Sequence, residues 1–341
     1  MEPKTYIGMD RNEKELIWFA VINTYAASSK ASSLWKNAQT CLKFKGVRFH
    51  GTMTGRAGTA SELTFDACMA GYRRFIAVGG DGTVHDVLNG IAAYLDWQEP
   101  SGKQMSFSDF TLGVIPLGSG NDWIKSLGIP CDISKAIDVL AHGETARQDV
   151  VRVSVLDPHS LQEETVINVS YMANVGGVGI DANVCRYVNR MKQEGRKGKI
   201  LYVTSLLRAI RERVPVRVKV ISDGKEVFEG PYLSIAFGVG RFSGGGMRQT
   251  PAAVMDDGLL DMTVIPDLPM RRIAREAPRL FTETFLNVPE LTATKSRTIY
   301  VIPLEDGQPQ AVEVDGEVVG NAPVKLEVLD SQLNIIVPET R

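Results

Sequence analysis

The chain has 341 residues, of which 44% are hydrophobic and 23% are charged, and its formal net charge at pH 7 is −2. This composition excludes a disordered or fibrous protein, and the nearly balanced charge gives no reason to expect nucleic acid as a partner. The four cysteines and four histidines show no disulfide or metal-ligand spacing, so we expect reduced thiols and no zinc site.

The N-terminal residues are charged where a secretory signal would need an apolar core, which favours a cytoplasmic protein. The longest strongly apolar stretch, residues 16–22, is far shorter than the roughly 20 residues that span a bilayer. The length suits two domains. We place them at residues 1–148 and 149–341, because the hydrophobic periodicity changes between them.

Up to residue 148, segments typical of strands and helices alternate. We predict strands at 16–22, 47–49, 75–78 and 112–115, and helices at 29–42, 59–70 and 134–142. Repeated βα units predict a parallel sheet that is covered by helices on both faces.

Beyond residue 148, apolar and polar residues alternate with a period of two, as in half-buried antiparallel strands. The clearest such segments are 151–155, 216–220, 260–264 and 312–314, and predicted helical segments at 181–213 and 271–285 interrupt them. This half is therefore predicted to be a β-rich domain. Between Arg186 and Arg213 nine basic residues stand against two acids. Either a solvated helix face or a patch that meets anionic lipid headgroups explains this imbalance.

Two glycine-rich turns follow neighbouring strands of the first domain. The first is Gly79-Gly80-Asp81-Gly82-Thr83, and the second, residues 116–122, contains Ser119, Asn121 and Asp122. Backbone amides in such a turn, and the positive end of the helix after it, attract an anion. Because parallel strands end at the same edge of a sheet, both turns are expected to face one ligand, a nucleotide. A plain tight turn is the alternative for each.

The known phosphate-binding motifs are otherwise absent. The chain has no P-loop, no protein-kinase signature and no complete dinucleotide fingerprint. The negative charge of a phosphate would therefore be neutralised by helix N-termini and a metal ion. Asp81 is predicted to contact Mg²⁺ or a water molecule. The alternative is a local hydrogen bond of the Asx-turn kind. For Thr83 the structural alternative is a capping box with Asp86.

Two acidic turns stand out in the second domain. Asp256-Asp257-Gly258, just before the strand at 260–264, is either a plain turn or part of a Mg²⁺ site. Asp315-Gly316, between two alternating segments, is a strong hairpin signal.

Taken together, these motifs resemble the diacylglycerol kinase catalytic domain family, which includes sphingosine kinases and soluble bacterial lipid kinases. The similarity covers both glycine-rich turns, Gly244-Gly245-Gly246-Met247, residues 251–261 and Asp315-Gly316-Glu317, in family order. It implies an α/β domain like that of NAD kinases and diacylglycerol kinases, followed by an antiparallel β-sandwich, with ATP in the cleft between them. The implied reaction is phosphoryl transfer from ATP to a lipid hydroxyl, with diacylglycerol as the expected acceptor and phosphatidic acid as the product.

The resemblance also assigns roles to individual residues. The implied nucleotide contacts are Asn23, Thr54, Gly79, Gly80, Asp81, Gly82, Thr83, Ser119, Asn121 and Asp122. Asp257, with the backbone carbonyls of Val254 and Leu259, would hold a structural Mg²⁺. Asp81, Asp315 and Glu317 would be catalytic, with Glu317 as the base. The family element Asn-Pro-x-Ser-Gly is replaced at residues 23–27, where only Asn23 is retained.

Two alternatives remain open at this stage. An NAD kinase shares Gly-Gly-Asp-Gly-Thr but is disfavoured by residues 116–122 and by Asp315-Gly316-Glu317. A non-catalytic lipid or nucleotide sensor is suggested by the altered residues 23–27, although Asp81, Asp257 and Glu317 are retained. The expected partners are ATP, Mg²⁺ and a lipid alcohol, with peripheral contact to the membrane. The sequence leaves the oligomeric state open, a homodimer included.

Overall fold

The structure of the chain is a computed structural model that describes residues 11–23, 31–55, 59–98, 104–118, 120–180, 184, 187, 208–211, 213–305 and 309–339. The chain divides into two compact units. Unit 1 comprises Met1–Gln148 and Ser331–Arg341, and unit 2 comprises Asp149–Asp330. Within the described ranges, none of the helices combines the length and the apolar character needed to cross a bilayer.

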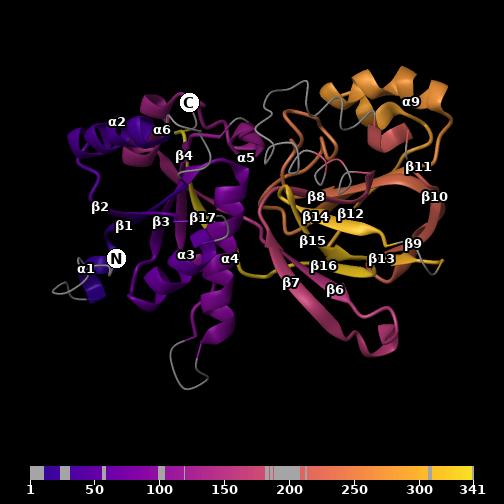
Figure 1. The fold of residues 1–341 in the computed structure, drawn as a ribbon, viewed down its shortest axis with the longest axis horizontal. Coiled ribbons are helices and arrows are strands. Elements are labelled where there is room, and N and C mark those ends of the chain that lie inside the picture. The colour runs from indigo at the N-terminus through magenta and orange to yellow at the C-terminus, as the bar shows by residue number, and fades with distance from the viewer. Residues whose placement is uncertain are drawn as a thin grey trace. The chain divides into compact units, whose positions relative to one another are not determined.

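Unit 1 is built on a six-stranded sheet with the strand order β2-β1-β3-β4-β17-β5 (Figure 1). Its strands are β1 (Trp18–Ile22), β2 (Phe49–Met53), β3 (Arg74–Gly79), β4 (Thr111–Pro116), β5 (Glu144–Gln148) and β17 (Leu333–Val337). All neighbouring strands are parallel except β17 and β5, which confirms the predicted parallel sheet. The sequence analysis groups residues 331–341 with the second domain, whereas in the structure β17 completes the sheet of unit 1.

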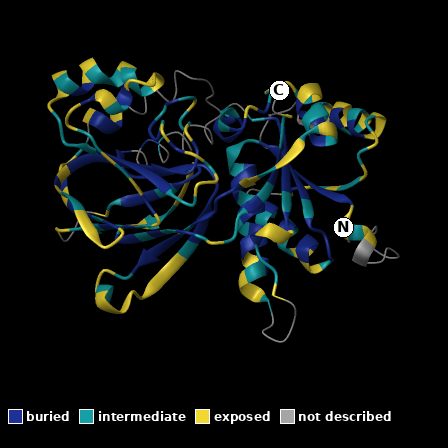
Figure 2. Cartoon of the chain, turned by 180° about the vertical axis from the view of Figure 1, so that it is seen from behind, coloured by how far each residue is buried: buried dark blue, intermediate teal, exposed yellow. Residues whose placement is uncertain are grey.

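Helices cover both faces of this sheet. They are α1 (Arg11–Glu15), α2 (Ala31–Phe44), α3 (Thr59–Met69), α4 (Asp81–Trp97), η2 (Phe107–Asp109), α5 (Asp122–Ser126) and α6 (Ile133–His142). On one face, Trp18 and Ile22 share a core with Trp35 of α2 and Ile137 of α6. The alternate residue Phe19 points to the opposite face and contacts Phe75. The central strands β1, β3 and β4 are therefore buried on both sides, as Figure 2 shows in dark blue.

Unit 2 is an antiparallel β domain, as predicted. Among the described residues its eleven strands follow the order β15-β14-β8-β10-β9-β13-β16-β6-β7, with β11 paired to β10 and β12 paired to β11. They are β6 (Val151–Leu156), β7 (Val166–Met172), β8 (Val175–Gly179), β9 (Val216–Ser222), β10 (Lys225–Gly238), β11 (Leu260–Pro266), β12 (Thr292–Ser296), β13 (Thr298–Pro303), β14 (Ala311–Val314), β15 (Glu317–Asn321) and β16 (Val324–Val328).

The sheet of unit 2 curls so that its two end strands approach each other. Asn168 Nδ2 on β7 donates to the carbonyl of Val319 on β15 at 2.7 Å. Curling encloses one continuous core in which alternate strand residues are buried, among them Val216, Val218 and Val220 of β9. The alternation read from the sequence is therefore the inward face of this sheet.

Short helices accompany the sheet: η3 (Leu161–Glu163), α9 (Met270–Glu276), η4 (Ala277–Phe281) and η5 (Phe285–Asn287). The single helix predicted over 271–285 is thus broken. Pro278 has no amide hydrogen with which to continue the α-helical ladder, and the chain passes into 3₁₀ turns there. Most of the segment predicted to be helical at 181–213, including six of its nine basic residues, lies outside the described residues.

Candidate functional site

The predicted nucleotide contacts of unit 1 follow the carboxyl ends of four neighbouring parallel strands. Register pairs Ile22 with Met53 and with Val78, which places these strand ends side by side. Beyond them, the Asn23 amide donates to the carbonyl of Val78 at 3.0 Å, and the Thr54 amide donates to the carbonyl of Ile22 at 2.9 Å. In an open parallel sheet this edge is where ligands bind.

The two glycine-rich turns contact each other through their backbones. The amides of Leu117 and Gly118 both donate to the carbonyl of Gly79, at 2.8 and 3.2 Å. A Cβ built on Gly118 would lie 2.6 Å from the Cα of Gly80, and one built on Gly80 would lie 3.2 Å from the Cα of Gly118. Side chains are therefore excluded from this contact, and the turns form one surface lined by backbone.

Helix α4 begins within the first turn. Gly80 is its N-cap residue, and its carbonyl accepts from the amides of Thr83 and Val84. The capping box suggested for Thr83 and Asp86 is wrong, because the helix starts at Asp81. Thr83 is instead almost fully buried, and its hydroxyl accepts a hydrogen bond from Asn23 Nδ2 at 3.1 Å. The one retained residue of the altered family element is thus attached to the glycine-rich turn.

Asp81 connects the two turns. Its Oδ2 accepts from the Asp122 amide and its Oδ1 from the Trp123 amide, both at 3.0 Å. These amides lie in the first turn of α5, which has no intrahelical acceptors for them. The carboxylate of Asp81 therefore caps α5 and fixes it against the start of α4.

The second turn is held in an unusual backbone conformation. Asn121 is left-handed, with φ 51° and ψ 49°, and its Nδ2 donates to the carbonyl of Gly118 at 2.9 Å. Its buried Oδ1 has no hydrogen-bond partner among the described residues. Asp122 pairs with Lys125 Nζ at 2.5 Å, so a cation that the sequence analysis did not consider lies at this turn. The predicted contact Ser119 lies outside the described residues.

In unit 2, the turn Asp315-Gly316 joins β14 to β15, which confirms the predicted hairpin. Asp315 is left-handed and only 8% exposed. Its Oδ2 accepts from the Ala173 amide and its Oδ1 from the Asn174 amide, both at 2.9 Å. Glu317, two residues later, is exposed. No signal in the sequence marks Asn174, because its amide contacts Asp315, which lies far from it in the chain.

The residues proposed for a structural Mg²⁺ lie in the loop before β11. Asp257 Oδ1 accepts from the Leu259 amide at 3.1 Å, and Asp257 Oδ2 lies 3.1 Å from Lys295 Nζ. Lys295 also pairs with Asp261, whose pKa is raised by burial. No cluster of three His, Cys, Asp or Glu side chains in the described ranges is arranged to hold a metal ion. The Asp257 carboxylate thus already faces an ammonium, and the Mg²⁺ site stays a prediction.

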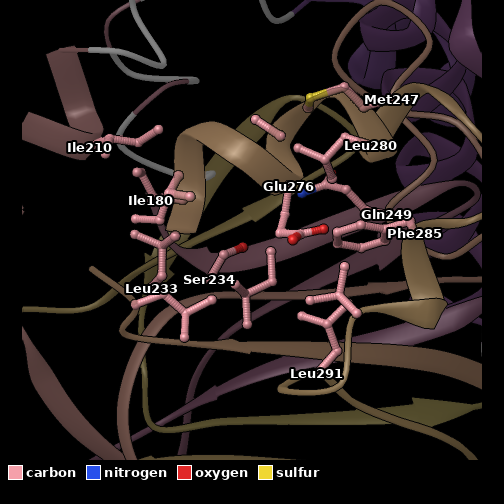
Figure 3. A pocket seen from close by; sticks show the side chains of 15 residues that line it. Ile180, Ile210, Leu233, Ser234, Met247, Gln249, Glu276, Leu280, Phe285 and Leu291 are labelled. Carbon is pink, nitrogen blue, oxygen red and sulfur yellow. The ribbon is translucent and has the colours of Figure 1, made fainter. Parts of the chain in front are cut away.

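Unit 2 also contains an apolar pocket of about 650 Å³, its open part included (Figure 3). The pocket is lined by the β8–β10–β11 region on one side and by α9, η4 and η5 on the other. Its lining residues are Ile180, Ile210, Leu233, Ser234, Met247, Gln249, Ile265, Leu268, Ile273, Glu276, Ala277, Leu280, Phe285, Val288 and Leu291.

Polar groups in this pocket are few. Figure 3 shows the carboxylate of Glu276 between Ser234 and Phe285. This carboxylate is neutralised by arginines of the same helical segment, with Arg279 Nε at 2.9 Å and Arg275 Nε at 3.0 Å. No local signal in the sequence marks this pocket, because its walls come from distant segments that show only ordinary core patterns.

Comparison with known proteins agrees with this architecture. Residues 18–153 match the model of the diacylglycerol kinase catalytic domain, and residues 174–337 match that of the YegS C-terminal NAD kinase beta sandwich-like domain. A protein named diacylglycerol kinase from Mycobacterium tuberculosis (strain ATCC 25618 / H37Rv) is 25% identical over 320 residues, which are 94% of each chain. One of the same name from Bacillus subtilis (strain 168) is 26% identical over 307 residues, covering 89% of this chain and 91% of that protein.

The fold has also been seen in a crystal. A structure described as a diacylglycerol kinase from Bacillus anthracis str. Sterne superposes with a TM-score of 0.71 at 21% sequence identity. The superposition covers 94% of this chain and 97% of that one. The two chains therefore share a fold over nearly their full lengths.

Proposed function

Because the chain belongs to the diacylglycerol kinase catalytic domain family and is a lipid kinase of that kind, we propose that it transfers the γ-phosphoryl group of ATP to the hydroxyl of diacylglycerol, giving phosphatidic acid. The observation that carries this proposal is the backbone-lined surface at the ends of β3 and β4. It combines backbone amides, the N-terminus of α4 and glycines that let the two turns approach closely, which is what a polyphosphate requires.

The nucleotide is bound, in this proposal, by residues at the edge of the unit 1 sheet. The first amides of α4, that of Gly82 included, face the phosphates, because a helix leaves its first N–H groups without internal acceptors. Asn23, Thr54 and Asn121 contact the nucleotide beside them. Asp81 holds α5 in place and keeps lone pairs for water on the Mg²⁺ that accompanies ATP. That ion would neutralise phosphate charge during transfer.

The acceptor is activated by the β14–β15 hairpin of unit 2. The lipid hydroxyl oxygen forms a bond to the γ-phosphorus, the bond from that phosphorus to the β–γ bridging oxygen breaks, and ADP leaves. Glu317 takes the hydroxyl proton, a role that needs an accessible carboxylate within hydrogen-bond reach. Asp315, whose oxygens already accept two backbone amides, positions the hairpin.

The apolar pocket of unit 2 supports a lipid acceptor. Its lining is almost entirely hydrocarbon, and its polar groups are few. Each CH₂ group moved from water into such a lining contributes about 0.8 kcal/mol. We assign the pocket to a hydrocarbon chain of the substrate, which predicts that the KM for the lipid falls as its chain is lengthened, until the pocket is full.

The test is a radiolabel transfer assay with labelled ATP and Mg²⁺. The protein is offered mixed micelles of diacylglycerol, of sphingosine or of detergent alone, and NAD in a parallel reaction. Labelled phosphatidic acid supports the proposal. Label on sphingosine would show that the acceptor is sphingosine and not diacylglycerol. Labelled NADP would show that the protein is an NAD kinase, and ATP binding without transfer would indicate a sensor.

A further inference from the structure

Lys295 connects two carboxylates of unit 2. Strands β11 and β12 are antiparallel, and their register sets Lys295 directly opposite Asp261. The Lys295 Nζ lies 3.2 Å from Asp261 Oδ2 and 3.1 Å from Asp257 Oδ2. One ammonium thus pairs with an acid on the strand and with an acid in the loop that precedes it.

The three charged groups differ in burial. The Asp261 side chain is 9% exposed, against 27% for Asp257 and 35% for Lys295. Asp257 uses its other oxygen to accept the Leu259 amide, so both of its oxygens are engaged. A buried carboxylate such as that of Asp261 needs a paired charge, and Lys295 provides it from the adjacent strand.

The rest of the loop, residues 253–259, is held by protein groups as well. The amide of Gly258 donates to Asp149 Oδ2 at 2.8 Å, and the Asp149 amide donates to the carbonyl of Met255 at 2.6 Å. Arg241 Nε donates to the carbonyl of Ala253 at 2.9 Å. These bonds attach the loop to neighbouring segments at both ends.

We propose that in this chain the Lys295 ammonium takes the place that the family resemblance gives to a structural Mg²⁺, so that loop 253–259 is held without a metal ion. Mg²⁺ at Asp257 would have to displace the ammonium or lie beside it, and it loses its water reluctantly. A tethered cation is always present at the site, whereas a bound one depends on its concentration. This inference concerns the folding of unit 2 and does not rest on the proposed reaction.

The experiment compares the nucleotide-free protein with Lys295→Met, which keeps the length of the side chain and removes its charge. For the wild type we expect the same unfolding temperature in millimolar Mg²⁺ and in excess EDTA, and no Mg²⁺ binding by calorimetry. For Lys295→Met we expect a lower unfolding temperature in EDTA, a saturable rise on adding Mg²⁺, and one Mg²⁺ bound per chain.

A matched control is Lys219→Met. Lys219 also pairs with two carboxylates of unit 2, Glu226 at 3.1 Å and Glu229 at 3.5 Å, but on an exposed strand face. Its loss should change stability little and create no response to Mg²⁺. The proposal is overturned if the wild type binds Mg²⁺ without nucleotide and is stabilised by it, or if Lys295→Met behaves like the control. Should Lys295→Met not fold, the wild-type measurements alone decide.

Discussion

The substitution Gly118→Ala tests whether the two glycine-rich turns act as one surface. The new Cβ would lie 2.6 Å from the Cα of Gly80 and 2.7 Å from the Oδ1 of Asn121, both well inside van der Waals contact. Because the first of these neighbours is backbone, the turns must separate. Overpacking of this kind costs about 1–3 kcal/mol of stability. A hydrogen bond to a charged group contributes about 1.5–3 kcal/mol, so misplacing one phosphate-binding amide should weaken ATP binding about 10- to 100-fold.

The assay is ATP binding by calorimetry together with KM for ATP, each measured well below the unfolding temperature. Gly90→Ala is the control, because its Cβ would lie 2.5 Å from the carbonyl of Ser61 where α4 packs on α3, inside the same unit. It should lose stability to a similar degree and keep its affinity for ATP. Equal ATP affinity in Gly118→Ala and wild type would refute the assignment of these turns to the nucleotide.

Three further substitutions have defined outcomes. Asp81→Asn should abolish most activity in a protein that still folds, and unchanged turnover would contradict the role of Asp81. The free energy of unfolding in urea should fall by about 1–3 kcal/mol, because the single oxygen of the new side chain can accept from the amide of Trp123 or of Asp122 but not from both. Glu317→Gln should lower kcat about 10²- to 10⁴-fold without shifting the unfolding temperature, since the side chain is exposed; a loss that appears only in KM would argue against a base. The hydrogen bond from the Tyr300 hydroxyl lowers the pKa of Glu164, so this carboxylate stabilises the fold above its ordinary pKa of 4.5 and ceases to do so as the pH falls. On acidification, Glu164→Gln should therefore lose less free energy of unfolding than the wild type does. The difference should be under about 1 kcal/mol, because the Glu164 side chain is 44% exposed. The same dependence of unfolding free energy on acidic pH in both proteins would contradict this.

Much of the fold is predictable because its signals are local. The βα alternation of unit 1 and the period-two segments of unit 2 depend on neighbouring residues, and both appear in the structure. The pairing of β17 with β4 is different, since the whole of unit 2 separates these strands in the sequence. The sequence of a five-residue apolar strand does not indicate which sheet the strand joins. Periodicity therefore places residues 331–341 in the same domain as the residues that precede them.

Some parts of the candidate site can likewise be predicted from the sequence, and others cannot. The glycine-rich turns are recognisable because residues within each turn set their own geometry. The partners of Asp81, Asp315 and Asp257 come from segments elsewhere in the chain, so no local sequence pattern predicts these contacts. The role of Lys295 depends on the register of β12 against β11, which only the folded sheet fixes. Lys125 is the exception, because its i, i+3 spacing from Asp122 is visible in the sequence.

The β14–β15 hairpin shows how two acids in one turn acquire different tasks. Asp315 is buried, and each of its oxygens accepts a backbone amide from the segment between β7 and β8. Both oxygens of Asp315 are therefore used to hold the turn in place. Glu317 starts the next strand and is exposed, so it is accessible to a substrate hydroxyl. Asp315→Asn should therefore destabilise unit 2, whereas Glu317→Gln should act on turnover alone, and similar stability losses in both variants would refute this division.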